Sequence, residues 1–211
     1  MAINLKVSVV DSAHASAPWL SKNAIEETMI FSKELKEGLE SGQETKSKGM
    51  LLTATLTEIN GGTSHNVTPK ECVSTFDIRI PVDTNCKIVE QKISVLVNEI
   101  SQRRKVEAYY SIIDETEPFE APHDSAIVRA FTLGVMDVEH TRPTLIRKTG
   151  TGDMNVIGNQ WKIPVVTYGP GDPHQAHTID ERVSIDEYLR GIEILKRMIH
   201  HLKRLHDKNM Q

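Results

Sequence analysis

Two imidazoles on a Gly- and Pro-rich loop are the side chains of this 211-residue chain that could most directly hold a metal ion. His174 and His177 lie within residues 169–181, after a short apolar run at 163–166 and before a long amphipathic segment. Loops that leave the ends of strands are where α/β proteins place ligands, and a neutral imidazole is a common zinc ligand. The rest of the chain lacks the carboxylates and further histidines that would complete a metal site. The sequence therefore predicts one part of an active site.

Four other polar positions suggest chemistry, although each signal is weak by itself. His14 lies where a first strand gives way to a helix, and taken alone it predicts a solvent-facing turn histidine. Asn66 lies in a polar turn, where its amide either donates to an oxyanion or simply forms the turn. Arg79 ends an apolar strand, which suits either a carboxylate ligand or a salt bridge on the strand face. The small residues of 148–153 enter a helix and would expose backbone N–H groups to an anion.

Apolar periodicity in the first half of the chain predicts the elements that position these residues. The alternation and helical spacing indicate the order βαββαβ, which is the split arrangement of a ferredoxin-like domain. Pro18 is expected to open the first helix, with Met29 on its apolar face, and Ile88 is expected on the apolar stripe of the second. The strands are expected at 3–11, 50–59, 72–80 and 106–113, and the second helix at 87–100.

The second half predicts alternating helices and short strands, which call for a parallel sheet covered on both faces. Two short strands cannot build such a sheet, so this part is either a small appendage or one portion of a larger sheet. We therefore expect two domains, at residues 1–115 and 116–211. Helices are expected at 125–138, 153–158 and 185–202, and strands at 144–147 and 163–167.

Composition excludes several classes of function. A net charge of −4, with 26% charged residues, offers no basic face for nucleic acid, and no apolar run approaches the length of a membrane span. The first residues lack the basic-then-apolar order of a signal peptide. Cys72 and Cys86 form no CxxC pair and predict structural thiols in a reduced, cytoplasmic protein.

Five motifs in order resemble the dinuclear-zinc aminoacylase/carboxypeptidase family, which includes acetylornithine deacetylase and succinyl-diaminopimelate desuccinylase. A closer likeness, carried by the last two motifs, is to hydrolases that release lysine or ornithine from the amino-group carrier protein LysW. The motifs are HASAPW with NAI (14–25), GGTSHNVTPKEC (61–72), FDIRIP (76–81), KTGTGDMN (148–155) and YGPGDPHQAHTIDERV (168–183).

The resemblance implies amide hydrolysis by a metal-bound hydroxide, with two zinc ions in a complete site and cobalt as an alternative metal. His177 would be a zinc ligand, and His174 a neighbouring loop residue. Complete members carry a His-x-Asp motif and a Glu-Glu pair before the lid domain, and this sequence has no equivalent; Glu26 and Glu27 lie on an amphipathic helix. We therefore expect a fragment that binds zinc weakly and is inactive alone.

The resemblance also implies a role for each remaining position. The ferredoxin-like half would be a lid and homodimerisation domain, followed by the C-terminal part of an α/β zinc-hydrolase catalytic domain. His14 would act in trans, polarising the scissile carbonyl and the oxyanion in the partner's active site, with Asn66 near the same substrate. Arg79 would bind a substrate carboxylate, with backbone contacts from Gly150 and Thr151.

Two alternatives to a carrier-linked substrate remain open at this stage. The substrate would be an acidic amino-group carrier protein bearing lysine or ornithine, or a small acyl-amino acid as in the deacylases and carboxypeptidases of the same family. Alternatively, the chain is a non-catalytic module that dimerises and binds a ligand. Zinc content and hydrolysis of an acyl-lysine would distinguish these possibilities.

Overall fold

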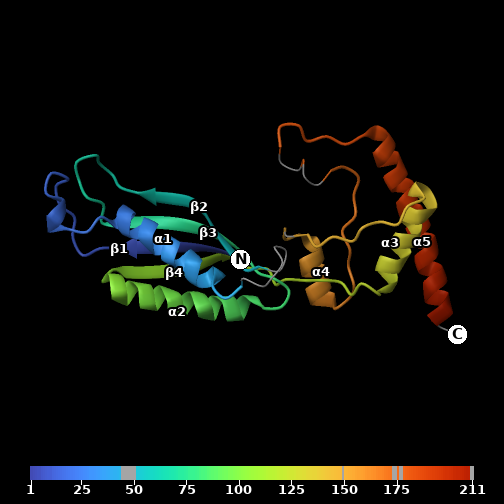
Figure 1. Ribbon diagram of the computed structural model, residues 1–211, viewed down its shortest axis with the longest axis horizontal. Helices are drawn as coiled ribbons and strands as arrows, with labels where there is room; N and C mark the ends of the chain where they lie inside the picture. Colours follow the sequence, from blue (N-terminus) through green and yellow to red (C-terminus); the bar gives the residue numbers. More distant parts are fainter. Residues whose placement is uncertain (44–50, 149, 173–174, 176–177, 210–211) are drawn as a thin grey trace. The chain divides into compact units, whose positions relative to one another are not determined.

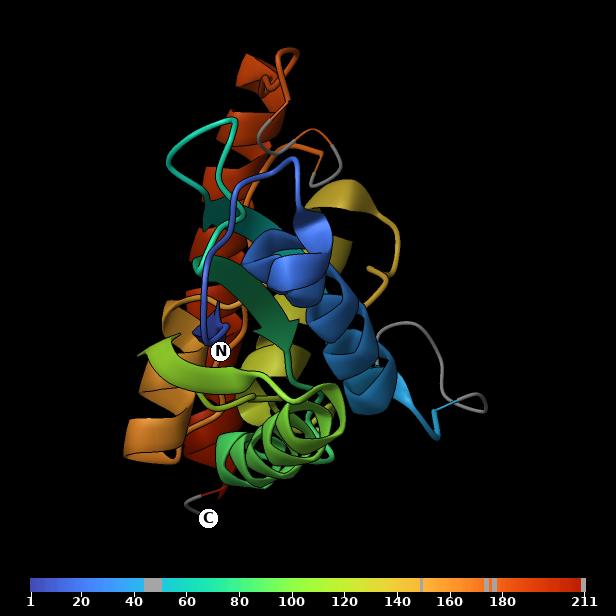
Figure 2. The same ribbon diagram turned by 90° about the vertical axis from the view of Figure 1, so that its left-hand side faces the viewer.

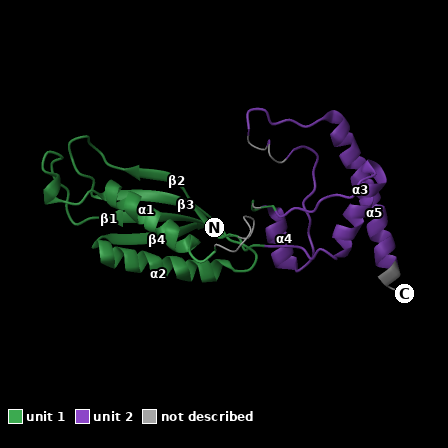
Figure 3. Cartoon of the chain, in the orientation of Figure 1, with its two compact units in different colours: residues 1–118, 148–151 green, residues 119–147, 152–211 purple. Residues whose placement is uncertain are grey.

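The chain folds as two compact units, which Figure 3 shows in different colours and which we describe separately. Unit 1 comprises residues 1–118 and 148–151, and unit 2 comprises residues 119–147 and 152–211. None of the helices in the described part of the chain is long and apolar enough to cross a membrane. The computed structural model describes residues 1–43, 51–148, 150–172, 175 and 178–209.

Unit 1 is a four-stranded antiparallel sheet with the strand order β2-β3-β1-β4. Both of its long helices lie on the same face of the sheet, as Figures 1 and 2 show. This is the predicted α+β, ferredoxin-like arrangement. The strands are β1 (Ala2–Ser8), β2 (Thr53–Gly61), β3 (Glu71–Arg79) and β4 (Glu107–Asp114), and the helices are α1 (Ala24–Glu40) and α2 (Cys86–Arg104).

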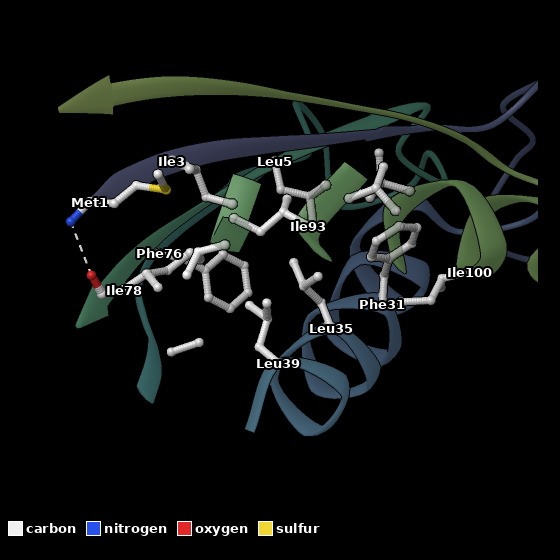
Figure 4. Packing of buried hydrophobic residues seen from close by; sticks show 14 of the residues in the cluster. Met1, Ile3, Leu5, Phe31, Leu35, Leu39, Phe76, Ile78, Ile93 and Ile100 are labelled. Carbon is white, nitrogen blue, oxygen red and sulfur yellow. Dashed lines mark hydrogen bonds between the residues drawn. The ribbon is translucent and has the colours of Figure 1, made fainter. Parts of the chain in front are cut away.

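The core of unit 1 lies between the sheet and these two helices. In β1, alternate residues such as Ile3 and Leu5 are fully buried, as the strand period of two requires. Phe31, Leu35 and Leu39 of α1 point into the same layer (Figure 4) and are also fully buried. Burial of one such side chain contributes about 1.5–3 kcal/mol, whereas an exposed ion pair contributes about 0.2–1 kcal/mol. The apolar layer therefore dominates the stability of the unit.

The start of the first helix differs from the prediction. Pro18 opens only a short 3-10 turn, Pro18–Leu20, and α1 begins separately at Ala24. Asn23 caps α1, because its side-chain oxygen accepts the backbone N–H of Ile25. Met29, predicted on the apolar face, is 59% exposed, since it lies six residues from Leu35 and well off the buried stripe.

The second helix differs from the prediction at one position. Ile88, which was predicted on the apolar stripe of α2, is exposed. The stripe that packs against the sheet begins instead at Val89 and continues at helical spacing through Ile93, Val97 and Ile100. Asn85 ends the preceding loop and caps α2 by accepting the backbone N–H of Ile88. Ile93, Val97 and Ile100 are buried as predicted, so only the first position of the stripe differs.

The described residues of unit 2 form three helices, α3 (Ala126–Glu139), α4 (Asp153–Trp161) and α5 (Ile185–Asn209), joined by segments without regular secondary structure. The helices α3 and α5 pack closely at Gly134, where an added Cβ would meet the backbone of α5 at 2.9 Å. The strands predicted at 144–147 and 163–167 are not formed. A strand exists only by pairing, and no described segment of unit 2 pairs with either one.

A second apolar stripe on α5 is exposed. Leu189, Ile192 and Ile199 are 56%, 37% and 64% exposed, although they recur at helical spacing. The opposite side of α5 is buried against α3, where Ile194 is 3% exposed. The described residues of unit 2 therefore cover only one of the two apolar faces of this helix.

Candidate functional site

The register of the sheet brings two loops together at one end of unit 1. In the β1–β3 ladder Ser8 pairs with Glu71, so the loop that leaves β1 and the loop that enters β3 start side by side. His14 lies in the first loop and Asn66 in the second, far apart in the sequence. In Figure 1 both loops extend from the same end of the sheet. The fold thus collects two of the predicted site residues.

Backbone hydrogen bonds hold these two loops against each other. His14 and Val67 form an isolated antiparallel bridge. The N–H of Ala15 donates to the carbonyl of Asn66 at 2.8 Å, and the N–H of Thr68 donates to the carbonyl of Ala13, also at 2.8 Å. The relative position of His14 and Asn66 is therefore set by main-chain atoms on both sides of each residue.

Thr68 strengthens this connection through its side chain, and sequence reasoning missed it. Its hydroxyl oxygen accepts the N–H of Ala13 at 2.7 Å and donates to the Ala13 carbonyl at 3.1 Å. The hydroxyl of Ser21 lies 2.7 Å away from the same oxygen. Thr68 is only 6% exposed, although it lies in a polar turn. The sequence offered only a threonine immediately before Pro69 as a signal, and its burial became known from the structure.

The imidazole of His14 is exposed and is held from one side by Ser16. The Ser16 hydroxyl lies 2.7 Å from Nδ1, and the Ser16 backbone N–H donates to the same nitrogen at 3.2 Å. A backbone N–H can only donate, so Nδ1 acts as an acceptor. In the neutral ring the proton then lies on Nε2, which is free to donate to a ligand.

Asn66 is also oriented by a neighbouring serine. The hydroxyl of Ser64 donates to the Asn66 side-chain oxygen Oδ1 at 2.6 Å. This bond leaves the amide nitrogen as the free end of the side chain, and Asn66 is exposed. His14 and Asn66 therefore each present an N–H donor at the same end of the sheet. Two such donors are what a developing oxyanion requires.

Arg79 lies at the opposite end of the sheet from this pair. Its guanidinium forms a two-pronged ion pair with Asp77, with Nε at 2.6 Å from Oδ1 and Nη2 at 2.8 Å from Oδ2. The side chain is nonetheless 46% exposed. The strand β3 has nine residues from Glu71 to Arg79, and its eight steps of about 3.3 Å each put its ends roughly 26 Å apart. One chain does not bring Arg79 to His14.

The loop before α4 is the fourth predicted site element. Gly150 and Thr151 belong to the compact unit that contains Arg79. At Gly152, the N-cap of α4, the backbone N–H donates to Asn155 Oδ1 at 3.2 Å. A Cβ added at Gly152 would meet nothing within 4 Å, so the backbone here is open to approach. His174 and His177, the latter the predicted zinc ligand, lie outside the described residues.

Comparison with known protein families identifies the first unit. Residues 6–105 match the peptidase dimerisation domain of the M20 type. The chain contains an M20 peptidase dimerisation domain. The match includes β1 from Lys6 onward, all of α1 to α2, and both loops of the His14 and Asn66 pair.

Relatives of known sequence extend the similarity beyond this dimerisation domain. The LysW-lysine/LysW-ornithine hydrolase of Saccharolobus islandicus is 32% identical over 137 residues, which cover 65% of this chain and 37% of that protein. A putative LysW-lysine/LysW-ornithine hydrolase of Thermococcus kodakarensis is 40% identical over 94 residues, which cover 44% of this chain and 27% of that protein. The chain therefore spans only about a third of the length of these relatives.

Solved structures share the fold over nearly the whole chain. The M20 family metallo-carboxypeptidase Sso-CP2 from Sulfolobus solfataricus superposes with a TM-score of 0.74 at 15% identity, covering 95% of this chain and 58% of that one. A tripeptidase from Staphylococcus aureus gives the same TM-score at 19% identity, covering 96% of this chain and 51% of that one. At these identities the likeness concerns the fold alone.

One group of potential metal ligands occurs at the edge of the dimerisation domain, within the described residues. Ligand atoms of Cys86, Glu115 and Glu117 lie within 4.8 Å of one another. Burial, followed by the negative charges of Glu117 and Glu115, raises the pKa of the Cys86 thiol to about 12. Glu117 accepts the backbone N–H of Cys86 at 3.0 Å, and the thiol contacts the Thr116 carbonyl at 3.5 Å. The group caps α2 and keeps the thiol protonated.

Proposed function

We propose that the chain is part of an amide hydrolase of the M20 type in which the dimerisation domain supplies His14 and Asn66 to the active site of a second copy. The observation that carries this proposal is the separation of the predicted site residues. His14 and Asn66 share one end of a sheet that is roughly 26 Å long, and Arg79 lies at the other end. One small substrate cannot contact both ends of one sheet, but it can contact opposite ends of two sheets in a dimer.

In the proposed reaction, the two donors at the tip of the domain act on the oxygen of the scissile amide. The Nε2–H of His14 and the side-chain amide of Asn66 would donate to the carbonyl oxygen as it gains negative charge. Removal of one donor of this kind costs about 10²–10³ in kcat in other hydrolases. Because neither donor needs to give up its proton, both act by stabilising charge and not as bases.

Arg79 is proposed to bind the carboxylate of the substrate. Its fork of N–H groups is now occupied by Asp77, which shows that the side chain can present a two-pronged donor to a carboxylate. A substrate carboxylate would replace or share this partner. Gly150 and Thr151, in the same compact unit, would add backbone N–H groups.

The described residues do not build a hydrolytic metal centre. The one close group of potential ligands among them is Cys86, Glu115 and Glu117; Glu117 already accepts the backbone N–H of Cys86, and the thiol contacts the Thr116 carbonyl. We therefore derive no step through a metal. Zinc, with cobalt as the alternative, is proposed as the metal of the complete hydrolase, with His177 as the ligand from this chain and the others from additional polypeptide.

The exposed edge of the dimerisation domain supports self-association. The strand β2 is a sheet edge, which leaves backbone donors and acceptors available for pairing. Leu56 and Ile59 of this strand are 41% and 42% exposed, and Met29 and Ile30 of the neighbouring α1 are 59% and 41% exposed. An apolar edge of this kind suits a homodimer in which two copies pair through β2.

Lysine or ornithine linked to an acidic carrier protein is the substrate we propose, because relatives that are 32% and 40% identical carry that activity in their names. The test uses the active hydrolase that contains residues 1–211, assayed with LysW-bound lysine and with free acyl-amino acids. If the free acyl-amino acids were hydrolysed faster, the substrate would be a small acyl-amino acid, as for a deacylase or carboxypeptidase, and not the carrier-linked amino acid. Turnover by residues 1–211 alone with added zinc would contradict the need for further polypeptide.

A mixing experiment tests the supply of residues in trans. The variants H14Q and R79A are each expected to be inactive as homodimers. In a mixed dimer, one site receives His14 from the R79A copy and retains Arg79 from the H14Q copy. Because random exchange makes half of the dimers mixed, the mixture should recover about a quarter of wild-type activity. If both residues served the same chain's site, the mixture would stay inactive.

A further inference from the structure

Ser16 holds the His14 ring through two donors. Its hydroxyl lies 2.7 Å from Nδ1 and its backbone N–H lies 3.2 Å from the same atom. Ser16 is the only side chain in the described part of the protein that hydrogen-bonds to this ring. Nε2 faces away from these bonds, because the two ring nitrogens point in different directions.

The backbone of His14 is fixed independently of Ser16. The His14 carbonyl accepts the N–H of Ala17 at 2.8 Å, and His14 pairs with Val67 across the loops. Rotation of the side chain is therefore the freedom that remains, and the bonds from Ser16 to Nδ1 remove it. The turn brings the hydroxyl of the residue two positions after the histidine to the Nδ1 edge of the ring, so a hydroxyl side chain at this position can make the bond.

The identity of the donors decides what the ring can do. A carboxylate at Nδ1 would orient the ring so that Nε2 accepts a proton, as a general base does. Donors at Nδ1 have the opposite consequence: Nδ1 must accept, so the neutral ring carries its proton on Nε2. The ring then presents a donor to the substrate side and not a base.

We propose that Ser16 is a positioning residue that keeps His14 in the Nε2–H form and aims this N–H at the substrate carbonyl. The proposal rests on the proposed function, in which His14 stabilises the oxyanion. Ser16 itself touches no substrate and acts through the ring. Its removal should therefore lower kcat and leave KM nearly unchanged, because the donor matters most when charge develops on the oxygen.

The first test observes the ring directly and needs no activity. Nitrogen-15 NMR of the imidazole groups in the 211-residue chain, with H14Q used to assign the His14 signals, should show a protonated Nε2 and a hydrogen-bonded Nδ1. In S16A the Nδ1 signal should move toward that of an unbonded nitrogen, and S16T should restore it. S12A is the matched control, because Ser12 lies in the same loop and makes no side-chain hydrogen bond with the described residues. A proton on Nδ1 in the wild type, or an unchanged Nδ1 signal in S16A, would overturn the proposal.

The second test uses the active hydrolase. Loss of one well-oriented hydrogen bond to the ring should lower kcat about five- to tenfold in S16A, with S16T and S12A close to wild type. Equal kcat values for S16A and S12A would overturn the positioning role. If H14Q remained fully active while the NMR results held, the proposed function of His14 would fail and the hold of Ser16 on the ring would stand.

Discussion

The substitution Thr68→Val tests whether one buried hydroxyl holds the two site loops together. Valine has nearly the same shape as threonine, so it removes the hydroxyl without opening a cavity. Thr68 is 6% exposed, and its oxygen bonds both backbone groups of Ala13 and lies close to the Ser21 hydroxyl. The change therefore removes these bonds and leaves the Ala13 N–H without its acceptor.

The expected cost follows from these contacts. A hydrogen bond contributes about 1 kcal/mol net, and a partly buried N–H that loses its acceptor costs about 1–3 kcal/mol. The local cost is therefore about 2–4 kcal/mol. Because a whole domain has a stability of about 5–15 kcal/mol, unit 1 should stay folded while the loop pair opens roughly 30- to 1000-fold more often.

Amide hydrogen exchange is the assay that separates local opening from global unfolding. Hydrogen exchange of the Ala15 N–H, which donates to the Asn66 carbonyl, should become roughly 30- to 1000-fold faster. The exchange rate of Leu5 in the centre of β1 should change far less. The matched control is Thr57→Val, because the Thr57 hydroxyl makes one bond on an exposed edge. If Ala15 exchanged equally in Thr68→Val and Thr57→Val, Thr68 would not hold the loops together.

Three further predictions concern the two units separately. Burial opposes ionisation of Glu40, but hydrogen bonds from Lys36 and from a β2 backbone N–H outweigh it and lower the pKa of Glu40. The ionised Glu40 carboxylate therefore stabilises unit 1 fully above the unfolded pKa of 4.5, and this stabilisation is lost as the pH falls through the lowered folded pKa. In urea unfolding, E40Q should cost about 1 kcal/mol at pH 7 and progressively less as the pH falls below 4.5; a cost that does not change with pH would contradict this. Burial and nearby carboxylates raise the pKa of Cys86 to about 12, so a thiolate-specific reagent at pH 8 should modify Cys86 only as fast as unit 1 unfolds; rapid modification of the folded protein would show the thiol to be ionised. Gly134→Ala places a Cβ 2.9 Å from the α5 backbone and should destabilise the α3–α5 pair by about 1–3 kcal/mol in thermal unfolding. Gly169→Ala, which would meet nothing within 4 Å, is its control, and equal melting temperatures would refute the close packing.

Local patterns were sufficient for most of unit 1. The alternation of Ile3, Leu5 and Val7 predicted β1, because a half-buried strand must place every second side chain in the core. The order of elements then predicted the ferredoxin-like topology, since few arrangements connect βαββαβ without crossing. The start of α1 was predicted less well, because both Pro18 and Asn23 are good helix-start residues and only the structure shows which one is used.

Unit 2 shows where local patterns fail. The apolar runs at 144–147 and 163–167 predicted strands, but a strand depends on a partner that supplies the other half of each hydrogen bond. No partner occurs in the described residues of the unit, and neither run forms regular secondary structure. The helices needed no such partner, because α3 and α5 satisfy their own backbone bonds and pack on each other at Gly134.

The chemistry divides in the same way. By itself, the sequence determined which residue types are present, their order, and the family that their motifs resemble, because these are properties of neighbours along the chain. Only the tertiary structure decided that Ser16 and Thr68 support His14, and that His14 meets Asn66 at one end of the sheet while Arg79 lies at the other. The Ser16 bond depends on how the turn at His14 folds, whereas the placement of Thr68, Asn66 and Arg79 depends on the antiparallel register, which pairs residues distant in sequence, and no local pattern records that pairing.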